Sequence, residues 1–410
     1  MSLDLNFIRS QFPALDGDWI FFDNAGGTQT ARQVGERLTD YLFHTNVQLG
    51  ASYKVSQIAG QRVREAQVAW AKWIRAAEPE EIIFGSSTTQ LLQNLSKSFS
   101  MAFKSGDEVI VTNCDHEANI GPWRYLERFG IIVKEWKINP DDFRLHNEDL
   151  LPLLTDKTRL VAFTHVSNIL GILNPVRELT AFIHEHGAMV CVDGVAYAPH
   201  RILDVTEWDV DFYVFSLYKV YGPHCSLLYA KRKHLENLPG INHFFIDHDA
   251  IPLKLQPGHV NFELTYSLTG ILDYFVLLTS RHFPGNPRNI PAPDHDLFGL
   301  LAGHEEELSA TLLDFLASRK GVRIIGEQSA GRNVRVPTIS FVAENIRSDE
   351  AVVQVDPHRI GIRFGDFYAR RLIEDLGLSK RNGVIRVSMV HYNTVEEVRR
   401  LIGALEGILK

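Results

Sequence analysis

The chain has 410 residues, a length that indicates two unequal domains rather than one core. Hydrophobic residues make up 45% and charged residues 22%, which excludes a disordered or fibrous protein. The net charge of -8 and the lack of dense Lys or Arg runs exclude a polyanion-binding surface, so we expect no nucleic-acid partner.

Cysteine and histidine usage gives no sign of a metal or disulfide framework. Cys114, Cys191 and Cys225 have no metal-ligand spacing, and the histidines form no zinc motif, so we predict no metal and a reducing compartment. The N-terminus does not resemble a signal peptide, and no apolar run approaches the roughly 20 residues that span a bilayer. We therefore expect a cytoplasmic protein without a membrane partner.

The first 80 residues contain a short arm followed by scaffold helices. Residues 4–12 predict a helix that the following Pro13 and the turn at 16–18 end. An apolar stretch at 20–22 then runs into Asp-Asn-Ala-Gly-Gly-Thr, whose glycines would let backbone approach a ligand closely. Apolar residues at helical spacing predict helices over 31–43 and 57–77.

A Ser/Thr-rich turn at residues 85–90 joins a predicted strand, 81–84, to a predicted helix, 91–103. Free backbone N–H groups, hydroxyls and the helix dipole converge at such a turn, which makes it a candidate phosphate site. A plain helix cap is the alternative.

Strand and helix patterns then alternate. Predicted strands at 108–112 and 160–166 end in polar segments that contain His116 and Asn168, and residues 176–186 predict a helix. Repeated strand-helix units predict an α/β fold whose mainly parallel sheet binds ligands at the strand carboxyl ends.

Two more predicted strands, 188–192 and 211–216, lead to Asp193 and Lys219. Pyridoxal phosphate needs a lysine to hold its aldehyde as a Schiff base and an anion to keep its ring nitrogen protonated. Spacing alone favours the simpler interpretation, an Asp that closes a strand and a Lys in a surface loop.

The rest of the chain predicts a second domain. A proline-rich segment begins at Phe283, and beyond it we expect a helix (297–319), short strands (322–325, 338–342, 385–389) and a closing helix (395–409). We predict an N-terminal arm packing with the small domain (1–20), a large cofactor-binding domain (21–282), a linker (283–296) and a small α+β domain (297–410).

The motifs around Asp193 and Lys219 resemble the class V aminotransferase and cysteine desulfurase-like family of fold-type-I pyridoxal-phosphate enzymes. Val-Asp-Gly at 192–194 and Ser-x-x-Lys-x-x-Gly-Pro at 216–223 carry the resemblance, which spans nearly the whole chain. It implies a large domain with a seven-stranded-type, mainly parallel sheet. It also implies that Lys219 forms the internal aldimine and moves the substrate α-proton, while Asp193 holds the pyridinium.

The resemblance implies roles for other positions as well. His116 would stack on the ring as an acid or base, and Arg386 would bind the substrate carboxylate through a guanidinium fork. Thr88, Thr89 and Ser216 would contact the cofactor, and Asn168 would contact both cofactor and substrate. Asn24 would contact the substrate. Asn261 would reach the cofactor phosphate bound in the neighbouring subunit. The last contact implies a homodimer with shared active sites.

Three positions depart from the family pattern. Tyr368 stands where nearby desulfurases carry the cysteine that attacks substrate sulfur, and no cysteine lies in the C-terminal domain, which disfavours a persulfide mechanism. Ala196 and Tyr218 replace residues that are commonly Gln and His beside the ring.

We therefore expect a pyridoxal-phosphate-dependent enzyme that acts on an amino acid, with aminotransfer as the main reading. A β-eliminating lyase of the cysteine or selenocysteine type and an amino-acid epimerase are alternatives within the family. A silent pyridoxal-phosphate-binding protein is a non-enzyme alternative. A nucleotide site at 85–89 lacks both the dinucleotide glycine pattern and the phosphate-loop lysine.

Overall fold

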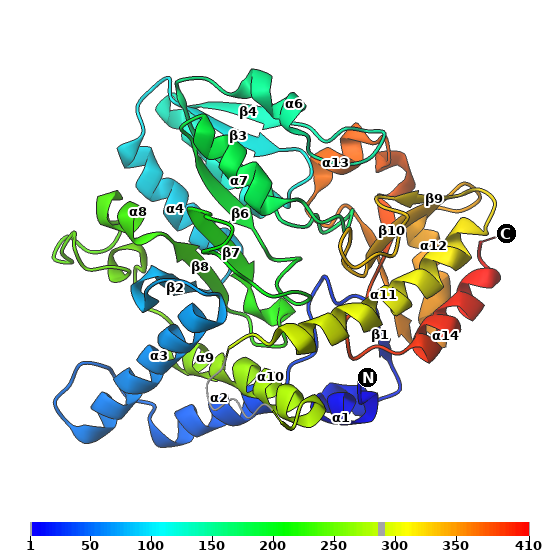
Figure 1. Ribbon diagram of the computed structural model, residues 1–410, viewed down its shortest axis with the longest axis horizontal. Helices are drawn as coiled ribbons and strands as arrows, with labels where there is room; N and C mark the ends of the chain where they lie inside the picture. The colour runs from blue at the N-terminus through cyan, green and yellow to red at the C-terminus, as the bar shows by residue number, and fades with distance from the viewer. Residues whose placement is uncertain (1, 286–291, 410) are drawn as a thin grey trace.

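The computed structural model describes residues 2–285 and 292–409 and contains a large and a small sheet with helices packed on them (Figure 1). The large sheet has seven strands in the order β2-β8-β7-β6-β5-β3-β4. Strand β8 runs antiparallel to its neighbours β2 and β7, and the other pairs are parallel. The strands are β2 (Ile82–Gly85), β3 (Glu108–Thr112), β4 (Ile132–Trp136), β5 (Thr158–Thr164), β6 (Met189–Asp193), β7 (Phe212–Ser216) and β8 (Ser226–Ala230).

The predicted α/β fold class is confirmed, and most of these strands match their predicted ranges. The edge strand β4 was not predicted, because its residues Ile132 to Glu135 are exposed or half-buried and include charged side chains. A strand at a sheet edge needs no continuous apolar run, so its pattern is weak.

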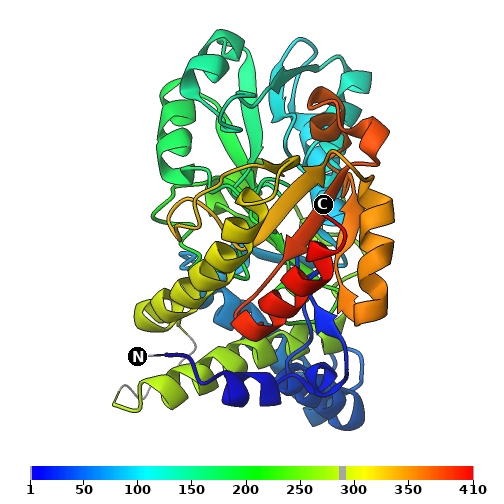
Figure 2. The ribbon, with the colours of Figure 1, turned by 90° about the vertical axis from the view of Figure 1, so that its right-hand side faces the viewer.

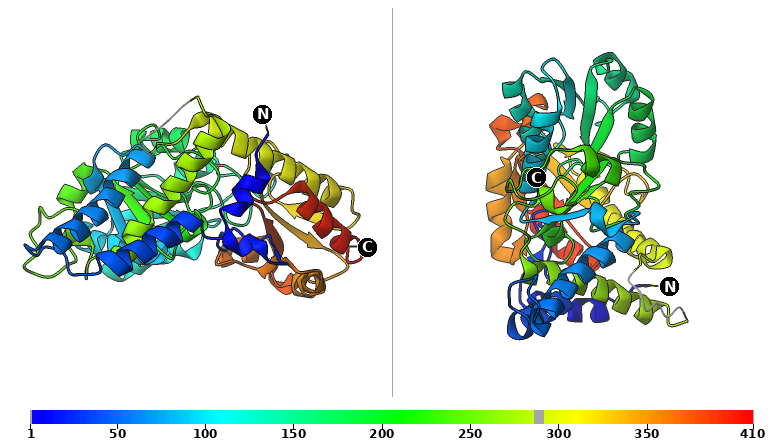
Figure 3. Two further views of the ribbon diagram at one scale, coloured as in Figure 1. Left: turned by 90° about the horizontal axis from the view of Figure 1, so that it is seen from below. Right: turned by 90° about the vertical axis from the view of Figure 1, so that its left-hand side faces the viewer.

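Side chains alternate between two cores on the faces of the large sheet. One face packs against α4 (Thr88–Ala102), and the other packs against α3 (Lys54–Trp73), α7 (Val176–Glu185) and α10 (Thr269–His282). Figure 3 shows the large sheet and its helices as one part of the molecule, with the small sheet beside it. Helix α4 begins at Thr88 rather than at the predicted residue 91, so its first turn includes the Ser/Thr-rich turn.

The small sheet has the order β12-β13-β10-β9, and all its pairs are antiparallel. Its strands are β9 (Val322–Ile325), β10 (Thr338–Ala343), β12 (Arg363–Gly365) and β13 (Val384–Ser388). One face packs against α11 (His295–Ala317), α12 (Ser348–Val355) and α14 (Val395–Glu406) (Figure 2).

Alternation along β10 and β13 turns polar side chains toward the large sheet. Ile385 and Val387 lie in the small core, whereas the intervening Arg386 pairs with residues outside it. On β10, the Ser340 hydroxyl donates to the carbonyl of Ile169, 2.7 Å away, in the loop after β5. The polar face of the small sheet therefore contacts the loop at the carboxyl end of β5 in the large sheet.

The N-terminal segment contacts the C-terminal part of the chain. Helix α1 (Leu5–Ser10) bears Arg9, which pairs with Glu397 of α14 at 2.9 Å, and β1 (Ile20–Phe21) pairs with β11 (Ile360–Gly361). The predicted linker falls partly on residues 286–291, outside the described residues, and the division into domains stays a prediction. The further helices are α2 (Arg32–His44), α5 (Gly121–Arg124), α6 (Asn147–Leu150), α8 (Arg232–Asn237), α9 (Phe262–Ser267) and α13 (Arg370–Asp375).

Within residues 2–285 and 292–409, no helix combines the length and apolar character needed to cross a membrane. In the same part of the chain, His, Cys, Asp and Glu side chains form no group of three suited to a metal ion.

Candidate active site

Asp193 and Lys219 lie at neighbouring strand ends of the large sheet. Asp193 is the last residue of β6, and Lys219 closes a short 3-10 turn that follows β7, the parallel neighbour of β6. Both side chains are buried and line one cavity. Seven predicted residues meet there: Thr88, Thr89, His116, Asn168, Asp193, Ser216 and Lys219.

Burial sets the charge state of the carboxylate and the amine. It raises the pKa of Asp193 to about 6, although the amide N–H of Val195, 2.8 Å from Oδ1, and the charge of Lys219 favour the anion. Burial, together with the positive charge of Arg386, lowers the pKa of Lys219 to about 8. At neutral pH Asp193 is therefore mostly an anion, and Lys219 is far closer to its nucleophilic neutral form than an ordinary lysine.

The N-terminus of α4 forms one end of the cavity. Ser87 caps the helix, since its hydroxyl accepts from the amide of Gln90 at 3.1 Å. Thr88 Oγ1 lies 2.8 Å from Ser216 Oγ, which ties the helix start to the end of β7, and Thr89 is exposed at the cavity edge. The first amides of a helix lack intrahelical partners, so this end suits a phosphate group.

His116 follows β3 and presents one defined ring nitrogen as a donor. Its Nδ1 accepts from the amide of Ala118 at 3.0 Å, so in the neutral ring the hydrogen is on Nε2. Burial and the nearby cations Lys219 and Arg386 lower the pKa of His116 to about 4. The ring is therefore neutral at pH 7, and the Tyr368 ring lies beside it at 5.2 Å between centroids.

Arg386, on β13, contacts Asn168 of the cavity lining without being part of that lining, and it retains unused donor capacity. Its Nη2 donates to Asp23 Oδ1 at 2.9 Å, and Nη1 donates to the carbonyl of Asn168 at 3.3 Å. The Phe367 ring covers the guanidinium at 3.7 Å. Among the described residues, the buried Nε has no hydrogen-bond partner, and neither does Asn168 Oδ1. Because buried polar groups are normally paired, these two atoms retain hydrogen-bonding capacity that a substrate could use.

Sequence reasoning did not assign site roles to Asp23, Phe367 and Arg363. Asp23 also pairs with Arg363 Nη1 at 3.4 Å, so it lies between two guanidinium groups. An Asp beside the Asn-Ala-Gly-Gly turn was visible in the sequence, but its partner is more than 360 residues away. Phe367 and Tyr368 have positive φ angles of 49° and 61°, which no sequence pattern indicated.

Three predicted residues do not line this cavity: Arg386, which contacts Asn168 of the lining, and Asn24 and Asn261. Both amide hydrogens of the buried Asn24 are used within the protein, on the carbonyls of Phe21 and Ser388 and on Asn393 Oδ1. Asn261 caps α9 by accepting from the amide of Leu264 and lies at a separate recess that includes Gly85. Its predicted contact with a neighbouring subunit therefore stays a prediction.

The cysteines offer no reactive thiolate near the cavity. Cys114, Cys191 and Cys225 are all buried, and burial raises the thiol pKa of each, to about 12 for Cys225. Tyr368, which we expected at the position of the family's attacking cysteine, is 69% exposed.

A second recess of about 940 Å³ opens beside the cavity. The two share Thr89, His116, Ala118 and Tyr218. The outer walls of the recess include the exposed apolar side chains Met101 and Phe129. There is room next to the cavity for a substrate side chain.

A buried carboxylate and lysine at the strand ends, with an anion-binding helix terminus, define the site class of fold-type-I pyridoxal-phosphate enzymes. The aminotransferase class-V family matches residues 20–274 and 300–401, so the chain belongs to that family. Membership confirms the prediction of a pyridoxal-phosphate-dependent enzyme of amino acid chemistry, of the cysteine desulfurase-like type.

Several known proteins are similar along their whole length. The chain is 43% identical to the aminotransferase-like protein FGM3 of Gibberella zeae, covering 100% of this chain and 99% of the relative. It is 34% identical to the cysteine desulfurase-like protein ustD of Aspergillus flavus, covering 99% and 91%. The cysteine desulfurase CsdA of Escherichia coli has a similar structure, with a TM-score of 0.84, 26% identity and coverage of 100% and 99%.

Proposed function

We propose that this chain binds pyridoxal 5'-phosphate in the cavity at Lys219 and acts on an α-amino acid without a thiolate of its own. The residues fit the cofactor: Lys219 for the aldehyde, Asp193 for the ring nitrogen, and the α4 start with Thr88, Thr89 and Ser216 for the phosphate. When bound, the cofactor supplies an electron sink for the pair released at the substrate α-carbon.

The observation that carries the substrate class is the free Nε of Arg386 beside the free Oδ1 of Asn168. A guanidinium N–H donates to a carboxylate, and an amide oxygen accepts from an amine, so together the pair suits an α-amino acid. Arg386 and Asn168 orient the substrate, Lys219 moves the proton at the α-carbon, and His116 donates through Nε2.

The absence of a thiolate narrows the reaction. With Tyr368 at the cysteine position and three buried thiols, the chain has no group poised to take up substrate sulfur. Aminotransfer therefore remains the main proposal, and β-elimination or epimerisation would use the same proton transfer by Lys219. The second recess leaves space for a substituent on the β-carbon.

The test is the visible spectrum of purified protein loaded with pyridoxal phosphate, compared with Lys219→Ala and titrated with a panel of amino acids. We expect a yellow band that the variant lacks and that selected amino acids shift. Product analysis then separates the reactions: a keto acid with aminated cofactor indicates aminotransfer, a released β-substituent indicates a lyase, and racemised substrate indicates an epimerase. A protein that stays colourless with added cofactor would overturn the proposal.

We also propose a cytoplasmic homodimer in which the loop ending at Asn261 approaches the partner's phosphate end. The three unpaired cysteines support a reducing compartment, and Asn261 lies on a loop accessible to a second copy. Light scattering on the purified protein tests the dimer. If the protein is a monomer and its cofactor affinity does not change with protein concentration, the proposal of shared active sites would be contradicted.

A further inference from the structure

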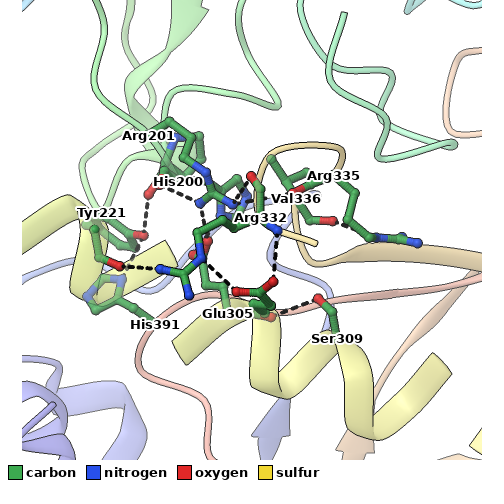
Figure 4. A network of polar contacts seen from close by, with 12 residues as sticks. His200, Arg201, Tyr221, Glu305, Ser309, Arg332, Arg335, Val336 and His391 are labelled. Atoms are coloured by element: carbon green, nitrogen blue, oxygen red, sulfur yellow. Dashed lines mark hydrogen bonds and ion pairs between the residues drawn. The ribbon is translucent and has the colours of Figure 1, made fainter. Parts of the chain in front are cut away.

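A fully buried histidine, His391, links three segments that surround the candidate active site. It lies between the hydroxyls of two buried tyrosines, Tyr221 and Tyr274. His391 Nδ1 is 3.0 Å from Tyr221 Oη, and His391 Nε2 is 2.5 Å from Tyr274 Oη. Figure 4 shows the contact between Tyr221 and His391 within a wider polar network that includes Glu305 and His200.

The hydrogen positions in this relay follow from one further contact. Tyr221 Oη donates to the carbonyl of Pro199 at 3.0 Å, so its single hydrogen is used and it can only accept from His391. His391 Nδ1 must then carry the ring hydrogen, which leaves Nε2 to accept from the hydroxyl of Tyr274. Burial lowers the pKa of His391 to about 3, so the ring is neutral and every donor in the relay has a partner.

Tyr221 connects the relay to the lysine turn, because it follows Lys219 by two residues. Its backbone has a φ of +62°, a left-handed conformation that is unfavourable for a non-glycine residue. The surroundings hold it there: its amide donates to Thr28 Oγ1 at 2.9 Å, and its carbonyl accepts from the amide of Ala31 at 3.0 Å. Strained residues persist where neighbouring contacts determine the conformation, and such sites cluster around active sites.

The other ends of the relay reach the remaining site elements. Pro199 belongs to the turn after Asp193, where the amides of Tyr197 and Ala198 donate to the carbonyl of Gly194. His391 follows the end of β13, the strand of Arg386, by three residues. Tyr274 belongs to α10 in the core under the large sheet.

We propose that His391 is a positioning residue, which through Tyr221 holds the turn that carries Lys219. The same relay fixes this turn relative to Asp193 and Arg386, so that amine, carboxylate and guanidinium keep one geometry. The inference rests on the proposed function for its consequence in catalysis, whereas the placement of Lys219 can be measured without cofactor.

The test compares Tyr221→Phe and Tyr274→Phe with wild type. The first removes the contact of the lysine turn with His391 and also its bond to the Pro199 carbonyl, whereas the second removes only the outer anchor of His391. Tyr266→Phe is the matched control, because Tyr266 is another buried tyrosine whose hydroxyl is bonded, to Arg37 at 2.7 Å, in a separate core cluster. Each change removes one hydroxyl and keeps the ring.

Two readouts separate positioning from general stability. Acetylation of the cofactor-free protein at a series of pH values, followed by mass spectrometry of the Lys219 peptide, gives the pH at which this amine becomes reactive. Absorbance titration with pyridoxal 5'-phosphate gives the dissociation constant. Thermal unfolding of each variant reports stability alone.

In Tyr221→Phe we expect the reactivity midpoint of Lys219 to move upward from wild type by about half a pH unit or more, because a relaxed turn exposes the amine. Cofactor affinity should fall by about tenfold, within the effect of a misplaced reacting group. Tyr274→Phe should also raise the reactivity midpoint of Lys219 and lower the cofactor affinity, but by smaller amounts than Tyr221→Phe. Tyr266→Phe should change neither quantity. If Tyr221→Phe does not fold, the Tyr274→Phe result decides.

Unchanged Lys219 reactivity and cofactor affinity in both variants, with a loss of melting temperature no greater than in Tyr266→Phe, would overturn the inference and leave the relay a structural contact. If the wild-type protein does not bind pyridoxal phosphate, the proposed function is overturned. The positioning role of His391 can still be judged in that case, because acetylation measures the reactivity of Lys219 without cofactor.

Discussion

The two walls of the candidate active site differ in how their residues are held. The cofactor wall consists of the ends of β6 and β7 with the start of α4, and it places Asp193 and Lys219 in the buried interior of the large sheet. The substrate wall consists of Arg386 on β13 and the loop 366–369, where Tyr368 is exposed. The residues proposed to hold the cofactor thus lie at or next to the ends of regular elements, while the proposed substrate surface is partly a loop.

Both walls include non-glycine residues with positive φ angles: Tyr221, two residues after Lys219, and Phe367 and Tyr368 in the loop. Phe367 and Tyr368 are consecutive non-glycine residues with positive φ, and the loop is fixed through its backbone: the Phe367 carbonyl accepts from Asn168 Nδ2 at 2.8 Å, and the Tyr368 carbonyl accepts from the amide of Glu117. Binding residues on loops over a rigid scaffold can change without loss of the fold.

The largest effect is expected on the cofactor wall. Asp193→Asn removes the anion that faces the cofactor ring nitrogen, and we expect kcat to fall by about 10² to 10³, the range for losing one preorganised electrostatic partner. The yellow band should persist, since Lys219 is intact. Activity within a few-fold of wild type would mean that the ring nitrogen needs no anion, and the comparison between the walls would fail.

Arg386→Gln should be the most damaging change on the substrate wall. Losing one member of a buried charge pair costs roughly 2–5 kcal/mol, which corresponds to about 30-fold or more in kcat/KM. The loss should appear mainly in KM for the amino acid, and cofactor affinity should stay near wild type. If cofactor affinity fell by as large a factor as kcat/KM, Arg386 would instead support the structure of the cofactor wall.

The pH dependence of cofactor capture should report the burial of Lys219. Only the neutral amine attacks an aldehyde, and with a pKa of about 8 its fraction rises from about one tenth at pH 7 to about nine tenths at pH 9. We expect the initial rate of appearance of the yellow band to rise about tenfold over this interval. A rate that keeps rising toward pH 10.5 would contradict the lowered pKa.

The sequence predicted the cofactor wall far better than the substrate wall, and the reason is physical. Strands such as β6 and β7 are continuous apolar runs, so their ends, and hence Asp193 and Lys219, can be read from local pattern. Three strands of the small sheet, β9, β10 and β13, were also close to their predicted ranges, whereas β12 was not predicted. The partner of Arg386, however, is Asp23, and the conformation of Phe367 depends on contacts distant in sequence. Pairing between residues so far apart has no local signature.

The smallest effect is expected at Asp23, which lies between the two walls. Asp23→Asn keeps an oxygen that can accept from Arg386 Nη2 but removes the negative charge, so the hydrogen bond weakens by about 1 kcal/mol, or about fivefold in equilibrium terms. If Asp23 orients the guanidinium, KM for the amino acid rises by up to that factor while kcat changes less. If Asp23 instead competes with the substrate carboxylate for Arg386, KM falls.

Asp18→Asn is the control, because its carboxylate also pairs with an arginine, Arg359, at an exposed site. If KM changes in both variants, the cause is the change in net charge. If KM changes only in Asp23→Asn, the cause is the lost interaction of Asp23 with the Arg386 guanidinium.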